Sequence, residues 1–322
     1  MFQGTYQKKK SICIIVLMAI LVLGVITGCQ GTRMEPAKAE NGETRIIEHA
    51  MGRTEIPGTP QRVVILTNEG TEALLALGVK PVGAVQSWTG NPWYEHIAKD
   101  MEGVTVVGLE SQVNLEAIAA LKPDLIIGNK MRQEKVYDQL NAIAPTVFAD
   151  TLRGKWQVNF ELYAKALNKE AEGKQVMADF EQRINDFKTK AGDKLTTEVS
   201  VVRFMPGKTR IYYKDTFSGV IFEQIGLARP AAQNKNTFAE EITMERIPEM
   251  EGDILFYFTY EQGNGEASKT EQEWLNNPLF KNLNVVKSEK AYKVDDVIWN
   301  TAGGVKAANL LLDDLNKFFF SN

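Results

Sequence analysis

This sequence of 322 residues has few cysteines, few histidines and only a small net charge. It contains 2 cysteines and 2 histidines, and its 37 Lys and Arg nearly balance its 41 Asp and Glu, giving a formal net charge of −4. Cys13 and Cys29 both lie near the N-terminus, so the rest of the sequence offers no thiol for a disulfide or a metal site. With only His49 and His96 available, a histidine-rich zinc or manganese site is not expected. The negative charge argues against nucleic acid as a partner.

The first 28 residues have the layout of a secretory signal peptide. Three lysines at positions 8–10 precede the apolar run Ile12–Ile26, which is too short for a comfortable transmembrane helix. The letters ITGC, ending at Cys29, resemble a bacterial lipobox, so Cys29 is expected to carry lipid as the first residue of the mature chain. Removal of the three lysines takes the net charge from −4 to −7. An uncleaved anchor helix is the alternative; in either case the folded part is expected outside the cytoplasmic membrane.

Beyond a polar tether predicted for residues 29–44, short apolar strands alternate with helical patterns. Helices are predicted at TEALLALG, which ends at Gly78, and at NLEAIAAL, which Asn114 caps. Such alternation is typical of a mostly parallel sheet covered by helices. The predicted strands of the first half are RIIEH, RVVILT, PVGAV, VTVVGL and DLIIG.

The centre of the sequence differs from both flanks. From Phe160 to Phe187 the apolar residues recur every three to four positions, which predicts one amphipathic helix roughly 40 Å long. Strand and helix patterns then resume at EVSVVRFM and continue to a last helix over Val305–Phe320. The predicted organisation is an N-terminal α/β lobe at 45–155, a linking helix at 156–192 and a C-terminal α/β lobe at 193–322.

An internal repeat supports two similar lobes. The pattern of residues 115–127 recurs at 244–256 with a constant offset of 129 residues: LEAI and DLII in the first copy match MERI and DILF in the second. Helix–turn–strand units also recur by chance in α/β proteins, but duplication is the favoured interpretation. A cleft between two such lobes is the default place for a ligand.

The stretch VVRFMPGKTRIYYKDTFSG, residues 201–219, contains a glycine-lysine-threonine that resembles the end of a phosphate-binding loop. The first glycine of that signature would fall on Val202, and a β-rich run follows Lys208 instead of a helix. A nucleotide site is therefore not expected. Residues 205–208 read better as the turn of a β-hairpin.

With period 2, the hairpin places Arg203 on one face of its first strand and Arg210 and Tyr212 together on one face of its second. Guanidinium groups bind carboxylate-like groups bidentately, and aromatic rings cover apolar parts of a ligand. The cluster therefore suits a planar, oxygen-rich anion. A solvated edge hairpin remains the alternative.

Three blocks carry a resemblance to a known family: RFMPGKTRIYYKDTFSG with IGLARP, then DLIIGNKMRQEKVYDQL, and then DDVIWNTAGGVKAANLLLDDL. They resemble the iron-siderophore substrate-binding lipoproteins of Gram-positive bacteria, particularly those for hydroxamate or citrate-type siderophores. The resemblance runs from about Arg45 to the C-terminus. It implies a periplasmic-binding-protein-like α/β fold of the helical-backbone type, with two Rossmann-like lobes joined by one long helix and only modest closure.

The resemblance also implies a function. The protein would be a lipid-anchored monomer that captures a ferric siderophore and delivers it to ABC permease subunits served by a cytoplasmic ATPase. It would be a binding protein and not an enzyme, and it would need no cofactor, because iron enters only as the ferric siderophore complex.

Ligand-binding residues follow from the matching blocks, with plain packing as the alternative for each tryptophan and helix capping or pairing for Arg132. Trp156 is the weakest of these candidates, and Tyr213 is less certain than Tyr212. The candidates are Arg203, Arg210, Tyr212 and Tyr213 from the hairpin, Trp88, Lys130 and Arg132 from the N-terminal lobe, Trp299 and Asn300 before the last helix, and Trp156.

Members of the family present one glutamate from each lobe to arginines of the permease. Glu72 matches the position in the N-terminal lobe. In the C-terminal lobe the matching position is Val220, which cannot serve, so Glu223 or the pair Glu240-Glu241 is expected instead.

Other functions remain open on sequence grounds. Haem or cobalamin uptake is the alternative within the same fold, and direct Fe³⁺ capture by Tyr212 and Tyr213 is disfavoured by the cationic neighbours. A secreted siderophore esterase would need a nucleophile, a base and an orienting acid. The sequence has no G-x-S-x-G, and neither histidine lies in a stretch that resembles a catalytic site.

Overall fold

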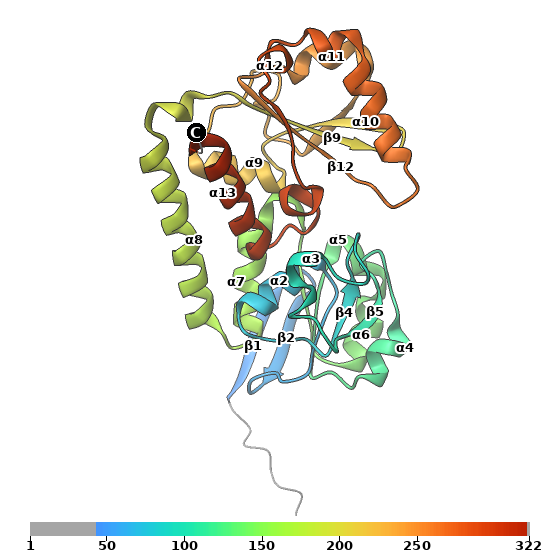
Figure 1. The fold of residues 1–322 in the computed structure, drawn as a ribbon. Coiled ribbons are helices and arrows are strands. Elements are labelled where there is room, and N and C mark those ends of the chain that lie inside the picture. The colour runs from blue at the N-terminus through green and yellow to red at the C-terminus, as the bar shows by residue number, and fades with distance from the viewer. Residues whose placement is uncertain (1–42, 321–322) are drawn as a thin grey trace, which may run out of the picture. The chain divides into compact units, whose positions relative to one another are not determined.

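The computed structural model describes residues 43–320, which fall within one compact unit (Figure 1). The predicted signal peptide, the lipidation site Cys29 and almost all of the predicted tether lie outside these residues. Within the described residues, no helix combines the length and the apolar composition that crossing a membrane requires.

The N-terminal half forms a six-stranded sheet in the order β6-β5-β4-β3-β7-β8, in which only β6 runs antiparallel to its neighbour. A separate antiparallel pair, β1 (Thr44–His49) and β2 (Gly52–Pro57), precedes it. The predicted strands of this half are all confirmed. The strands of the sheet are β3 (Val63–Ile65), β4 (Gly83–Gln86), β5 (Thr105–Leu109), β6 (Gln112–Val113), β7 (Leu125–Asn129) and β8 (Thr146–Ala149). Its helices are α2 (Asn68–Ala76), α3 (Glu95–Ala98), α4 (Leu115–Ala120), α5 (Lys130–Gln133), η1 (Glu134–Val136) and α6 (Tyr137–Ile143).

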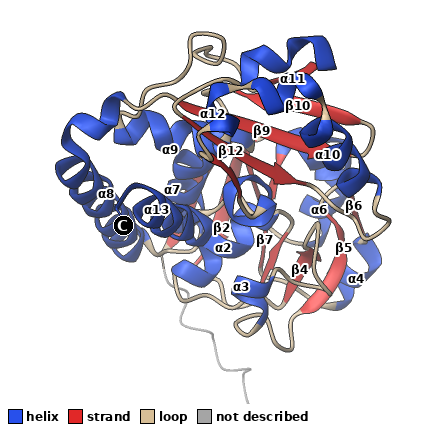
Figure 2. Ribbon diagram, turned by 45° about the horizontal axis from the view of Figure 1, so that its top comes forward, coloured by secondary structure: helices blue, strands red, loops and turns tan. Residues whose placement is uncertain are grey.

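The C-terminal half forms a five-stranded sheet in the order β11-β10-β9-β12-β13. Figure 2 shows β10, β9 and β12 of this sheet beside one another. β9, β12 and β13 run parallel to one another. β10 runs antiparallel to β9, and β11 runs antiparallel to β10. The strands are β9 (Val199–Met205), β10 (Lys208–Tyr212), β11 (Ala239–Ile242), β12 (Ile254–Thr259) and β13 (Ala291–Lys293). The helices are α9 (Phe217–Ile225), η4 (Met244–Met250), α10 (Glu266–Asn276), α11 (Pro278–Asn282), α12 (Asn284–Lys287), the π-helix η5 (Val297–Thr301) and α13 (Val305–Phe320).

The two copies of the repeat adopt matching structures. Residues 115–127 form α4 and the start of β7, and residues 244–256 form η4 and the start of β12. The aspartate of each copy has the same role: Asp124 accepts backbone hydrogen bonds of 2.8 and 2.9 Å from Gln61 and Arg62, and Asp253 accepts one of 2.8 Å from Glu198. Each aspartate therefore fixes the chain just before the neighbouring parallel strand. The second helix is a 3₁₀-helix that contains Pro248, which lacks the N–H that an α-helix needs.

The predicted single linking helix is wrong in one respect, because two helices replace it. α7 (Trp156–Ala166) ends before α8 (Glu170–Ala191) begins, and 3₁₀ turns flank the pair, η2 (Arg153–Lys155) before and η3 (Gly192–Thr196) after. At the break, Asn168 adopts a left-handed φ of 58°. The N–H groups of Asn168 and Lys169 donate to the carbonyls of Lys165 and Ala164, at 3.1 and 2.8 Å. This is the Schellman pattern of a helix end, which asparagine tolerates well. The apolar period passes through the break unchanged, so periodicity alone does not reveal it.

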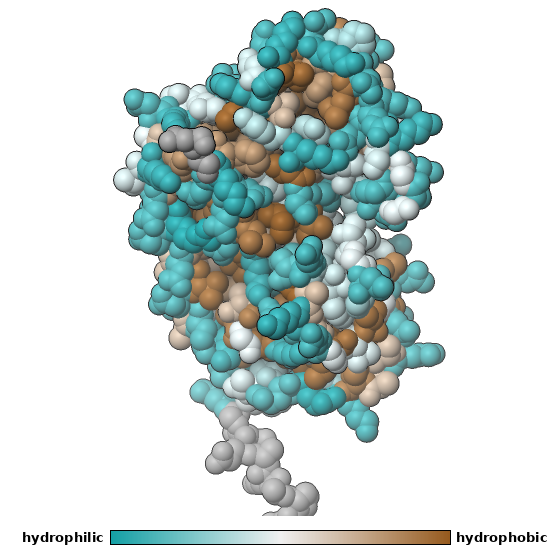
Figure 3. Space-filling view, in the orientation of Figure 1, coloured by the Kyte–Doolittle hydropathy of each residue, from teal (hydrophilic) through white to brown (hydrophobic). Residues whose placement is uncertain are grey.

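The largest hydrophobic cluster draws on both halves of the chain. It combines residues of α2, α7, α8, α9 and α13 with apolar residues of both sheets, and in Figure 1 α7, α8 and α13 lie beside one another. Two smaller clusters cover the other faces of the C-terminal and N-terminal sheets. On the face shown in Figure 3, hydrophilic residues cover much of the surface and hydrophobic ones show between them in separate patches.

Replacing Asn168 with valine is expected to lower the free energy of unfolding by about 1–3 kcal/mol, because a β-branched residue is strained at positive φ. Urea unfolding measures this. Asn168→Gly is the matched control, since glycine adopts this φ freely and loses only the 2.8 Å hydrogen bond from Asn168 Nδ2 to Thr59 Oγ1. Equal stability of the two variants would contradict the assignment.

Candidate ligand-binding cleft

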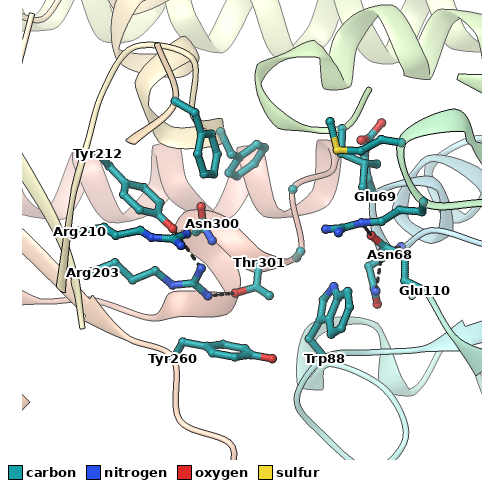
Figure 4. Close-up of a pocket in the computed structure, with 17 residues that line it drawn as sticks. Asn68, Glu69, Trp88, Glu110, Arg203, Arg210, Tyr212, Tyr260, Asn300 and Thr301 are labelled. Atoms are coloured by element: carbon teal, nitrogen blue, oxygen red, sulfur yellow. Dashed lines mark hydrogen bonds and ion pairs between the residues drawn. The ribbon is translucent and has the colours of Figure 1, made fainter. Parts of the chain in front are cut away.

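A cleft of about 390 Å³ lies between the two halves, lined by residues of both (Figure 4). The N-terminal lining residues follow the carboxyl ends of β3, β4, β5, β7 and β8, where ligands of open α/β sheets bind. The C-terminal lining comes from β9, β10, the first residue of α9, the residue before β11, the residue after β12 and the segment at 300–303 that leads into α13. The lining residues are Asn68, Glu69, Trp88, Glu110, Met131, Arg132, Leu152, Arg203, Arg210, Tyr212, Phe217, Phe238, Tyr260, Asn300, Thr301, Ala302 and Gly303.

The predicted hairpin is confirmed. β9 and β10 are joined by the two residues Pro206 and Gly207, and Gly207 has the positive φ of 68° that such a turn requires. Arg203 and Arg210 are direct cross-strand partners, so both side chains point to the same face. Both line the cleft together with Tyr212, as the alternation predicts. Figure 4 shows these three side chains gathered on one side of the cleft.

Arg203 is held by a buried ion pair. Its Nε and Nη2 donate to the two carboxylate oxygens of Asp296 at 2.6 and 2.9 Å, and Arg203 and Asp296 are 7% and 8% exposed. Nη1 donates to the Tyr212 hydroxyl at 3.0 Å, and the guanidinium lies 4.7 Å from the centre of the Tyr260 ring. Burial lowers the pKa of Arg203, but the neighbouring Tyr212 and Asp296 outweigh it and the net pKa is raised. Arg203 is therefore a fixed charge.

Arg210 is held more loosely. Its closest carboxylate is Glu241, at 3.9 Å, and that side chain is 56% exposed. Arg210 itself keeps 30% of its side-chain surface accessible. Because exposed pairs of this kind contribute little, Arg210 can turn its guanidinium to an incoming anion at small cost.

The opposite wall carries a third guanidinium. Arg132 Nε donates to Glu110 at 3.0 Å and its guanidinium lies 5.8 Å from the Trp88 ring centre. The other Glu110 oxygen accepts 3.0 Å bonds from the backbone and side-chain nitrogens of Asn68. Arg132 is therefore paired with a buried carboxylate, as Arg203 is, but its own side chain remains 39% exposed.

Six of the ten predicted ligand residues line the cleft, and four do not. Lys130 lies 3.9 Å from Glu134 in a surface ion pair. Tyr213 points to the other face of the sheet, where its hydroxyl donates to Glu240 at 2.7 Å. Trp156 and Trp299 are buried in the core, with 1% and 0% exposure. The six that line the cleft are Trp88, Arg132, Arg203, Arg210, Tyr212 and Asn300.

The two buried tryptophans have specific packing roles. Trp156 packs edge-on against Phe180 and Phe217, and Trp299 donates its indole N–H to Asp314 at 3.0 Å. The packing interpretation that the sequence left open for them is therefore the better one. Tyr213 follows Tyr212 directly, and alternation alone puts the two on opposite faces.

The glutamates predicted for permease docking lie in different surroundings. Glu72 is fully buried: His96 pairs with one oxygen at 2.5 Å, and the other accepts the Ala307 N–H of the first turn of α13 at 2.9 Å. It stabilises a helix N-terminus and is not available at the surface. Glu240 is bound to Arg246, Lys235 and Tyr213. Glu223 remains 59% exposed, with Lys214 at 3.5 Å.

Several lining residues were missed from the sequence. Glu69, Glu110 and Tyr260 all follow the carboxyl ends of strands, and strand-end position is the signal that could have identified them. Asp296, which contacts Arg203 without lining the cleft, also follows the end of a strand, β13. Thr301 had no such signal, because it lies at the end of η5 and its contact with Arg203 depends on the folded chain.

The fold and the site together define a class: a two-lobed α/β binding protein with its ligand cleft between the lobes. Residues 63–297 match the family described as periplasmic binding protein. The chain belongs to this family.

Named relatives of the chain are binding proteins. It is 52% identical to the probable siderophore-binding lipoprotein YfiY of Bacillus subtilis, over 97% of this chain and 98% of the relative. It is 30% identical to the Fe(3+)-citrate-binding protein YfmC of the same organism, over 97% and 98%. Among solved structures, Staphylococcus aureus SirA complexed with staphyloferrin B is 39% identical, with a TM-score of 0.80 over 85% of this chain and 98% of that one.

Asp296→Ala is expected to lower the free energy of unfolding by about 3–5 kcal/mol, because it leaves the Arg203 charge buried without its partner. Chemical denaturation measures the loss. Glu241→Ala, which removes the exposed partner of Arg210, serves as control and should cost less than about 1 kcal/mol. Similar losses in both variants would contradict the assigned role of Asp296.

Proposed function

We propose that this chain captures an anionic ferric siderophore in the cleft and delivers it to an ABC permease. The observation that carries the proposal is the convergence of three guanidinium groups, Arg132 from one half and Arg203 and Arg210 from the other, on one cleft. Arg132 and Arg203 are hydrogen-bonded to buried carboxylates, which fix the orientation of their guanidinium groups before a ligand arrives. Preorganised charges of this kind favour an anion with oxygen atoms on more than one side.

The chemistry of a ferric siderophore matches this lining. The chelator already supplies the oxygen donors around the iron, so the protein needs cations for the net negative charge and flat surfaces for the organic shell. Trp88, Tyr212 and Tyr260 offer such surfaces beside the arginines. The cleft volume of about 390 Å³ is within the usual range for small-molecule sites.

Carboxylate-rich chelates fit best within this class. Arginine binds planar carboxylates through two parallel N–H groups, and three arginines line the cleft. One named relative points the same way, because YfmC is an Fe(3+)-citrate-binding protein. The SirA structure contains staphyloferrin B, and a relative 29% identical to this chain is an achromobactin-binding protein of Dickeya dadantii. The name of YfmC supports a citrate-type ligand for this chain.

Delivery requires a membrane anchor and a docking surface. Lipidation at Cys29 would tether the protein to the outer face of the cytoplasmic membrane, and the name of YfiY as a lipoprotein supports this. Of the carboxylates predicted for permease docking, Glu223 is the one we retain, because it is 59% exposed on α9, whereas Glu240 and Glu241 each face an arginine of this chain. Its arginine-bearing partner would be a permease subunit.

The proposal is tested by titrating the purified protein with ferric citrate, ferric staphyloferrin B, a ferric hydroxamate, haem and cobalamin. Because Trp88 lines the cleft, a bound ferric complex is expected to quench tryptophan fluorescence, with tightest binding for the citrate-type chelates. Binding of haem or cobalamin without any ferric chelate would refute the proposal.

Arg210→Ala is expected to weaken ferric chelate binding by about 1.5–3 kcal/mol, the contribution of a charge-assisted hydrogen bond. Folding stability should change little, because Arg210 has only a loose partner. Lys130→Ala removes a cation on the N-terminal half that does not line the cleft, and its affinity should match the wild type. Equal affinities for all three proteins would exclude Arg210 as a ligand contact.

A further inference from the structure

The N-terminal wall of the cleft contains two buried carboxyl groups with different surroundings. Glu110 is 3% exposed and is neutralised by Arg132 at 3.0 Å. Glu69, at the start of α2, is 6% exposed and forms no ion pair with any residue of the described range 43–320. Both side chains line the same cleft, and Figure 4 shows both on the wall that faces the arginines of the hairpin.

The polar contacts of Glu69 are few. One carboxyl oxygen accepts a 3.2 Å hydrogen bond from Asn159 Nδ2, which also donates to the Thr151 carbonyl at 2.7 Å. The other oxygen, Oε1, has no hydrogen-bond partner within the described residues. An ionised carboxylate in such a site would lose its hydration without an opposite charge in return, which is strongly unfavourable.

The charged and titratable groups around Glu69 do not supply that charge. Glu72 lies on the same helix, Glu110 follows β5, and Tyr163 and Asn159 face it from α7. Arg132, whose side chain lines the same wall, is bound to Glu110. Burial raises the pKa of the Glu69 carboxyl well above its usual range; the Asn159 hydrogen bond opposes this, and the charges of Glu110 and Glu72 add to it.

We propose that Glu69 is a proton-holding residue of the cleft: it is neutral when an anionic ferric chelate is bound, so that capture is coupled to retention of its proton. The inference rests on the proposed function, since it assumes an anionic ligand. A neutral Glu69 removes a repulsive charge from the wall opposite Arg203 and Arg210. Once the group ionises, the same wall repels the ligand.

The direction of the pH dependence follows from linkage. A bound anion disfavours the ionised form of Glu69, so the complex keeps the proton to a higher pH than the empty protein does. Affinity is therefore full at low pH and falls as the pH rises through the pKa of Glu69 in the empty protein. The loss should be on the order of tenfold, the size of one unit charge roughly 10 Å away at an effective dielectric constant of about 20.

The test compares the full-length wild type with Glu69→Gln, which has nearly the same shape and stays neutral at every pH. Affinities for ferric citrate and ferric staphyloferrin B are measured by tryptophan quenching between about pH 5.5 and pH 9, above the ordinary carboxyl pKa of about 4.3. The ratio of the two affinities cancels the titration of the ligand itself. Glu273→Gln, which alters a 54% exposed carboxylate outside the cleft lining, is the matched control.

We expect the wild type and Glu69→Gln to bind equally at the acidic end and the wild type to become about tenfold weaker at the alkaline end. Glu273→Gln should follow the wild type throughout. If the ratio of the wild-type affinity to the Glu69→Gln affinity is constant across the pH range, or rises with pH, the inference is overturned. The proposed function is unaffected by that result. Lack of binding by either protein at any pH overturns the proposed function and this inference with it.

If Glu69→Gln does not fold, infrared spectra of the wild type with isotope-labelled glutamate decide the question. A protonated carboxyl band that persists with ferric citrate bound at neutral pH supports the inference. A spectrum with only ionised carboxylate bands overturns it.

Discussion

The buried ion pair between Arg203 and Asp296 is the contact on which the cleft depends. A hairpin that places two arginines directly opposite each other carries like charges on adjacent strands, which is unfavourable without compensation. Asp296 supplies the compensating negative charge and accepts two short hydrogen bonds from Arg203. The pair also ties the two ends of the π-helix η5 together, because Thr301, its last residue, donates to the carboxylate of Asp296, which precedes its first residue, and accepts from Arg203. π-Helical turns often mark functional sites, and here the turn carries Asn300 and Thr301 to the cleft.

From η5 the same network reaches the N-terminal half. The Tyr94 hydroxyl donates to the Thr301 carbonyl at 3.3 Å, and Glu72 caps the start of α13 a few residues later. Lys306 pairs with Asp100 at 2.7 Å beside that cap. The segment between β13 and α13 thus contacts the ligand lining and both halves of the protein. The glutamate that the family resemblance assigned to permease docking is part of this junction, where a buried carboxylate supports the N-terminus of a helix.

The two walls of the cleft hold their arginines by similar ion pairs, with Arg210 as the exception. Each wall has a guanidinium that is paired with a buried carboxylate: Arg203 with Asp296, and Arg132 with Glu110. Such pairs are expensive to desolvate, so their value lies in holding a charge in one orientation and not in stability. Among the residues that the structure describes, Arg210 has no buried partner, and it retains freedom to adjust. A cleft with two fixed cations and one movable cation suits an anion whose shape is set by its own iron coordination.

The sequence by itself determined the class of fold and one wall of the cleft. Strands, caps and the hairpin follow from local rules, and period-2 alternation was enough to put Arg203, Arg210 and Tyr212 on one face. The repeat was visible in the sequence because a helix–turn–strand unit is local, and the structure adds that its aspartates, Asp124 and Asp253, have the same hydrogen-bonding role. Only the tertiary structure decided that Trp156 and Trp299 belong to the core, that Glu72 is buried and that Glu69 has no cationic partner among residues 43–320. These outcomes depend on which residues meet across gaps of many positions, as when Ala307 reaches Glu72, and local pattern contains no information on such encounters.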